Sequence, residues 1–79
     1  MMKIKMKYFG LITNDLGSEA ELPEGSSVSD LLNLIVKQDP NYKEILTRAT
    51  ILVNNSKADI DTVLKHNDEV MVLAVLGGG

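Results

Sequence analysis

Residues 3–9 alternate strictly between apolar and polar side chains. Ile4, Met6 and Tyr8 fall on one side of an extended chain, while three lysines and Phe9 fall on the other. A period of two residues is typical of a β-strand with one buried face. The sequence therefore predicts a half-buried strand near its start, which limits the fold to one with a second layer to cover that strand.

A second, short strand is predicted over residues 19–22, between two segments that interrupt regular structure. Before it, residues 14–18 carry turn-forming side chains and a glycine. After it, Pro23-Glu24-Gly25 breaks the extended chain. Two strands are therefore expected ahead of any helix.

The main helix of the chain is predicted to follow. Its apolar residues have the spacing of a single helix face: Val28, Leu31, Leu32, Ile35 and Val36. Ser27 is the predicted N-cap, because its hydroxyl can accept from the backbone N–H of Asp30 while Asp30 can answer with its carboxylate. The helix is expected to end near Gln38, since Pro40 disfavours helical geometry at the residue before it.

The second half of the chain is predicted to hold three strands and two short helical turns. The strands are expected at residues 50–53, 57–58 and 69–75, and the turns at 41–47 and 61–64. This order fits an α+β domain with the β-grasp (ubiquitin-like) fold, a mixed sheet of four to five strands with one main helix on one face. Its first and last strands are expected to be parallel neighbours. The domain is expected to span residues 1–76, followed by a flexible glycine tail at 77–79.

Length and composition limit what such a domain does. A chain of 79 residues leaves little room for a deep substrate cleft, so an enzyme with its own active site is not expected. A net charge of −3 and the lack of Trp argue against nucleic-acid binding. Without cysteine the usual thiolate and metal sites are missing, and no bound metal or cofactor is expected. Neither a signal-peptide pattern nor a membrane-length apolar run is found, so we expect a cytoplasmic protein without membrane contact.

Three glycines, Gly77, Gly78 and Gly79, follow Leu76 at the end of the sequence. Glycine has no Cβ, so such a segment can pass through a tunnel too narrow for side chains and bring a terminal carboxylate to a catalytic centre. Coupling that carboxylate to AMP, at the expense of ATP, makes an acyl donor that a sulfur or amine nucleophile can attack. The other interpretation is a frayed end without function.

An apolar surface is predicted on the face of the sheet that the helix leaves open. If Tyr8, Val70 and Val72 point toward the helix, four apolar residues point away from it: Phe9, Met71, Leu73 and Val75. Grouped apolar side chains at a surface are typical of a protein interface, so these four are the candidate partner-binding surface. Two alternatives stay open, namely cover by segment 39–47 and self-association. The lysines at positions 3, 5 and 7 are expected to be solvated, with an acidic partner groove as the other interpretation.

Other polar residues are given no functional role. His66 is the one residue that titrates near neutrality, but it stands in a predicted turn without a second histidine or a cysteine. Asp59, Asp61, Asp68 and Glu69 do not have the spacing of a calcium loop. The four acidic residues are expected to be solvated turn residues, and His66 is expected to be a surface histidine without a function.

Four segments resemble the ubiquitin-like sulfur-carrier family, and most closely the small subunit of molybdopterin synthase; the thiamine-pathway sulfur carrier is related to it. The segments are Lys7-Tyr8-Phe9-Gly10, residues 21–32 (ELPEGSSVSDLL), residues 64–70 (LKHNDEV) and the terminal Gly78-Gly79. Asn67 stands where this family commonly has glycine, but asparagine tolerates the left-handed backbone conformation. Ala74-Val75-Leu76 stands where many molybdopterin synthase small subunits have prolines.

The resemblance implies a carrier cycle rather than catalysis by this chain. A ubiquitin-activating-type enzyme would adenylate Gly79 with ATP and magnesium, and a sulfur donor would convert it to a thiocarboxylate. Leu76, Gly77 and Gly78 would thread the active site of the large subunit of molybdopterin synthase or of an analogous sulfur-accepting enzyme. Two further functions stay open: a covalent protein modifier that transfers Gly79 to a lysine, and a noncovalent β-grasp interaction module.

Overall fold

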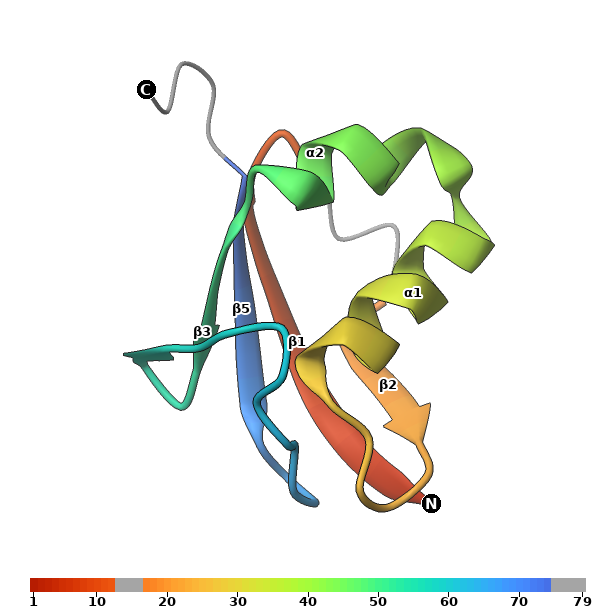
Figure 1. The fold of residues 1–79 in the computed structure, drawn as a ribbon, viewed down its shortest axis with the longest axis vertical. Helices are drawn as coiled ribbons and strands as arrows, with labels where there is room; N and C mark the ends of the chain where they lie inside the picture. The colour runs from red at the N-terminus through yellow and green to blue at the C-terminus, as the bar shows by residue number, and fades with distance from the viewer. Residues whose placement is uncertain (13–16, 75–79) are drawn as a thin grey trace.

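The computed structural model describes residues 1–12 and 17–74, and it shows one mixed sheet with its helices on one side (Figure 1). The strands are β1 (Met2–Gly10), β2 (Glu19–Leu22), β3 (Thr50–Val53), β4 (Ser56–Lys57) and β5 (Glu69–Ala74). The helices are α1 (Val28–Gln38), the 3-10 helix η2 (Pro40–Tyr42) and α2 (Lys43–Thr47). The five strands follow the order β2-β1-β5-β3-β4.

The last described strand lies inside the sheet, between β1 and β3. β5 runs parallel to β1, in a register that extends from Lys5 opposite Glu69 to Gly10 opposite Ala74. It runs antiparallel to β3, with Ile51 opposite Val72. The predicted parallel pairing of the first and last strands is therefore confirmed, and β5 is hydrogen-bonded along both edges.

Helix α1 begins at the predicted capping box. The backbone N–H of Asp30 donates to Ser27 Oγ at 3.3 Å, and the backbone N–H of Ser27 donates to Asp30 Oδ2 at 2.9 Å. Two more N–H groups of the first turn donate to a distant loop, from Val28 to the carbonyl of Thr62 and from Ser29 to that of Ile60. Because a helix leaves its first N–H groups without internal partners, these contacts complete its N-terminus.

The core fills the space between α1 and the inner face of the sheet. Its fully buried large side chains come from the two central strands, the helix and the loop before β5: Ile4, Val28, Leu31, Leu64, Val70 and Val72. Met6 and Ile35 are buried beside them, and Leu32 is half-buried. The prediction that one main helix covers one face of the sheet is therefore confirmed.

Three predicted elements differ from the structure. The helical turn predicted at residues 61–64 is wrong, because Val63 instead forms an antiparallel bridge with Ser27 and Leu64 donates its N–H to the carbonyl of Ser26. The expected turn at 41–47 consists of two elements, η2 and α2. The fourth strand begins one residue early, at Ser56.

No helix in the described part of the chain has the length and apolar character needed to cross a membrane.

Candidate functional site

The outer face of the sheet, turned away from α1, carries an apolar patch. The register of β1 and β5 sets Phe9 opposite Leu73, one pleat from Met71, so the three share this face. Phe9 is 54% exposed, and Met71 and Leu73 are half-buried. The structure thus brings together three of the four predicted surface residues, while the fourth, Val75, lies outside the described residues.

Leu52 belongs to the same patch and was missed by sequence reasoning. It pairs with Met71 in the antiparallel β3–β5 ladder, so its side chain is on the outer face, and it is half-buried. The alternation of the strand carries this information, because successive side chains point to opposite faces of a sheet. Ile51 faces the core, so Leu52 faces outward. We call Phe9, Leu52, Met71 and Leu73 the apolar patch.

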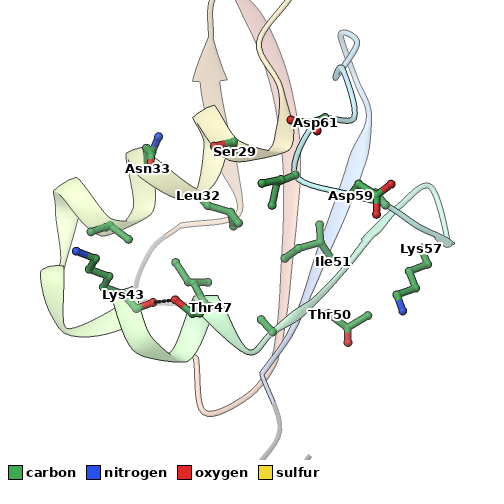
Figure 2. Close-up of a pocket in the computed structure, with 15 residues that line it drawn as sticks. Ser29, Leu32, Asn33, Lys43, Thr47, Thr50, Ile51, Lys57, Asp59 and Asp61 are labelled. Atoms are coloured by element: carbon green, nitrogen blue, oxygen red, sulfur yellow. Dashed lines mark hydrogen bonds between the residues drawn. The ribbon is translucent and has the colours of Figure 1, made fainter.

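Segment 39–47 does not cover the apolar patch. Its helix α2 lines a cavity together with α1 and Ile51, which is the helix side of the sheet (Figures 1 and 2). The alternative in which this segment shields the outer face is therefore wrong. Within residues 1–12 and 17–74 the patch is open to a partner.

The patch adjoins the last described residue of β5. β5 ends at Ala74, directly after Leu73, and the carbonyl of Ala74 accepts from the backbone N–H of Leu11 at 2.6 Å. Leu11 follows the end of β1 and is 48% exposed. The remaining predicted site residues, Leu76, Gly77, Gly78 and Gly79, lie outside the described residues.

The turn that leads into β5 is held by Asp68, which was expected to be a solvated turn residue. Asp68 accepts two hydrogen bonds, from Asn54 Nδ2 at 2.9 Å and from the backbone N–H of Lys65 at 2.8 Å. Asn54 Oδ1 in turn accepts from the backbone N–H of Glu69. Asp68 therefore joins the β3–β4 turn to the start of β5, which corrects its expected role as a solvated residue.

His66 also has a structural partner. Its Nδ1 accepts from the backbone N–H of Lys3 at 3.0 Å, which connects the loop before β5 to β1. An accepting Nδ1 places the proton of a neutral imidazole on Nε2. In the described part of the chain no three His, Asp or Glu side chains gather where they could hold a metal ion.

Tyr8 is a partly buried titratable group on β1. Burial raises the pKa of Tyr8 above its ordinary value of 10.0. The side chain lies on the inner face, against the core. The hydroxyl therefore stays protonated at neutral pH and supports packing rather than chemistry.

A second surface feature is a cavity of about 780 Å³ on the helix side of the sheet (Figure 2). Leu32 and Ile51 form part of its apolar wall, and its polar border carries Lys43 at one end and Asp59 and Asp61 at another. None of the predicted site residues lines it. These groups do not form a nucleophile with an adjacent base, so the cavity has no evident catalytic chemistry.

Comparison with known proteins places this architecture among small carrier subunits. A curated relative, the molybdopterin synthase sulfur carrier subunit of Mycobacterium tuberculosis, is 28% identical over 83 residues, covering 100% of both chains. The structure of a putative molybdopterin converting factor, subunit 1, from Pyrococcus furiosus is 32% identical, with a TM-score of 0.81, and covers 96% of this chain and 100% of that chain. These relatives confirm the β-grasp fold, and the curated relative is by its name a sulfur carrier subunit, as the sequence resemblance implies.

A third similarity concerns the fold alone. It is to a chain in the complex of subunits 1 and 2 of molybdopterin-converting factor from Helicobacter pylori, at 24% identity and a TM-score of 0.65, covering 99% of this chain and 100% of that chain. The model of the ThiS family matches residues 6–79. With nearly the whole chain inside that match, this protein belongs to the ThiS family.

Proposed function

We propose that this protein carries sulfur to molybdopterin synthase as a thiocarboxylate on Gly79. The observation that carries the proposal is the position of the apolar patch. Leu73 lies in the patch and Ala74 is the last residue of β5, so a partner seated on the patch is beside the point from which the chain continues toward Gly79. A carrier needs this arrangement, because the docking surface must bring the terminal group within reach of the partner's active site.

The cycle has two chemical steps, both performed by partners. An adenylating enzyme of the ubiquitin-activating type couples the Gly79 carboxylate to AMP, using ATP and magnesium and releasing pyrophosphate. A sulfur donor then displaces AMP and leaves a terminal thiocarboxylate. We place this cycle in the cytoplasm.

The large subunit of molybdopterin synthase is the proposed sulfur acceptor. The names of the Mycobacterium and Pyrococcus relatives support this choice, as does the two-subunit Helicobacter complex. Phe9, Met71, Leu73 and Val75 would contact this partner, with Leu52 added by the structure. Leu76, Gly77 and Gly78 would occupy the narrow entry to its active site, where side chains do not fit.

The test is intact mass spectrometry of the purified protein after incubation with ATP, magnesium, an adenylating enzyme from the same cell and a sulfide source. The expected product is heavier by one exchange of oxygen for sulfur. A variant without Gly79 is the control and should not change in mass. If the full chain also fails to change and pyrophosphate exchange is absent, the carrier proposal is wrong and a noncovalent interaction module explains the patch better.

The same reaction separates a carrier from a covalent modifier. When sulfide is omitted and lysine-containing proteins of the cell are added, a modifier would form an isopeptide bond between Gly79 and a lysine. A carrier is expected to return from the adenylate by hydrolysis. Stable conjugates that require Gly79 would therefore favour the modifier function.

A further inference from the structure

Lysines stand at both ends of a single row of residues on the outer face. The pairing registers place Lys7 on β1 opposite Met71 on β5, Met71 opposite Leu52 on β3, and Leu52 opposite Lys57 on β4. Directly paired residues of neighbouring strands share one face of a sheet. The centre of the apolar patch is therefore flanked by one lysine on each side.

The neighbouring rows have a different character. Toward the end of β5 the row contains Phe9, Leu73 and Thr50, and no charged residue. In the other direction, Lys5 pairs with Glu19 on β2 and with Glu69 on β5. The row between Lys7 and Lys57 is thus where basic side chains border the patch.

The remaining lysines of β1 already face acidic partners within the sheet. Lys3 is opposite Glu21, and Lys5 is opposite Glu19. The β1–β2 register ends at Lys5 and Glu19, so no residue of β2 pairs with Lys7 in the described part of the chain. The charges of Lys3 and Lys5 are therefore balanced by glutamates on β2 within a solvated ladder. Lys7 differs from them, because it lies beside the apolar patch.

Both flanking lysines remain available to a partner. Lys7 Nζ lies 3.6 Å from Glu69 Oε1, but the Lys7 side chain is still 56% exposed. An exposed ion pair of this kind contributes little free energy, so Lys7 can exchange Glu69 for a carboxylate of a partner. Lys57 is exposed at the edge of the sheet, where it also borders the helix-side cavity, and it forms no ion pair with a described residue.

The distance between Lys7 and Lys57 sets how far apart the matching carboxylates of a partner should be. Strands lie about 4.8 Å apart, so three steps from β1 to β4 separate the backbones of Lys7 and Lys57 by roughly 14 Å. The whole chain has a net charge of −3, so this row, with a lysine at each end, is opposite in charge to the chain as a whole. A complementary surface has an apolar centre with carboxylates on both sides at a similar separation.

We propose that Lys7 and Lys57 determine which partner docks on the apolar patch, by pairing with two acidic borders of an otherwise apolar partner surface. This inference rests on the proposed function, because it takes the large subunit of molybdopterin synthase as the partner. The patch supplies the buried contact area. The two lysines supply orientation and the rate of encounter.

The first test measures association of the carrier with that large subunit, using Lys7→Glu, Lys57→Glu and the matched charge reversal Lys37→Glu. Lys37 is exposed in the last turn of α1, on the other layer of the molecule. Each flanking variant is expected to lower the association rate constant about 10-fold at low salt, with a smaller loss at high salt. Lys37→Glu is expected to remain within about 2-fold of the unmodified chain.

A second measurement reads the contacts directly. A water-soluble carbodiimide joins an amine to a carboxylate that touches it, forming an amide with loss of water. Applied to the complex, it is expected to link Lys7 and Lys57 to Asp or Glu residues of the large subunit, as mapped by mass spectrometry. Links from neither lysine, together with association rates equal to that of Lys37→Glu, would overturn the inference.

The mass assay on Gly79 separates this outcome from failure of the proposed function. If the unmodified chain is thiocarboxylated and binds the large subunit while both lysine variants bind equally well, only the role of the lysines is wrong. If the unmodified chain neither gains sulfur nor binds, the proposed function and this inference are both overturned.

Discussion

Nδ1 of His66 accepts a hydrogen bond from the backbone N–H of Lys3, so the loop before the last strand is tied directly to the first strand. The two residues are 63 positions apart in the sequence. Replacing His66 with Phe keeps a planar ring but removes the acceptor, and we expect a loss of about 1 kcal/mol in the free energy of unfolding. Urea denaturation measures this loss.

Asparagine is the matched control at this position, because its side-chain oxygen can accept in place of Nδ1. His66→Asn is expected to retain most of the stability that His66→Phe loses. Equal stability of the two variants would show that the contact to Lys3 contributes nothing measurable.

The capping box of α1 gives a second prediction. Ser27→Ala removes the hydroxyl that accepts from Asp30, and we expect it to lower the free energy of unfolding by about 1 kcal/mol. Ser29→Ala, two residues later and inside the helix, is the control and should change stability little. The two variants are compared by thermal and urea denaturation. Equal free energies of unfolding would disprove the capping role.

Asn67 adopts a left-handed backbone conformation, with φ at 71°. Asn67→Val is expected to cost about 1–2 kcal/mol in unfolding free energy, because a β-branched side chain clashes with its own backbone there. Asn67→Gly should fold at least as stably as a chain with valine at this position, since glycine adopts this conformation freely. A valine variant as stable as the glycine variant would show that the turn rearranges.

Tyr8 predicts a dependence of stability on alkaline pH. Because burial raises the pKa of Tyr8 in the folded chain, the unfolded chain loses its phenol proton first as pH rises. The stability of the folded state is therefore expected to fall as pH rises above about 10, the unfolded value. Tyr8→Phe should lack this contribution. The difference in free energy of unfolding between the variant and the unmodified chain should therefore be constant near neutral pH. Above about pH 10 it should change in favour of the variant. A difference that stays constant across the alkaline range would contradict the burial of the hydroxyl.

Phe9 and Ile60 offer a matched pair for the docking surface, since their side chains are 54% and 59% exposed. Phe9 lies in the apolar patch, whereas Ile60 lines the helix-side cavity. Phe9→Ala is expected to weaken binding to the large subunit by about 2 kcal/mol, or roughly 30-fold in Kd, while leaving thermal stability nearly unchanged. Titration calorimetry with Ile60→Ala as control tests this, and equal affinities of the two variants would place the interface elsewhere.

Local signals in the sequence predicted much of the fold. The alternation over residues 3–9 and the Ser27–Asp30 cap depend on neighbouring residues, so β1 and α1 could be located from the sequence. The loop at 61–64 could not, because its conformation depends on backbone partners at Ser26 and Ser27, far away in the chain.

The same distinction applies to the site. Phe9, Met71 and Leu73 follow from alternation within two strands, once these strands are recognised as neighbours. Asp68 was misjudged because its partner Asn54 is 14 positions away, in another turn. The row that ends in Lys57 likewise requires the register of four strands, which no single segment specifies.

The position of β5 has a mechanical consequence. It runs parallel to β1 and is hydrogen-bonded on its other edge to β3, so a pull on the chain beyond Ala74 loads two ladders along their length. The bonds between Lys5 and Gly10 of β1 and their partners on β5 then resist sliding together, instead of opening one after another. A partner that draws the end of this chain into a narrow tunnel would therefore load both ladders in shear, the direction in which their hydrogen bonds must break together.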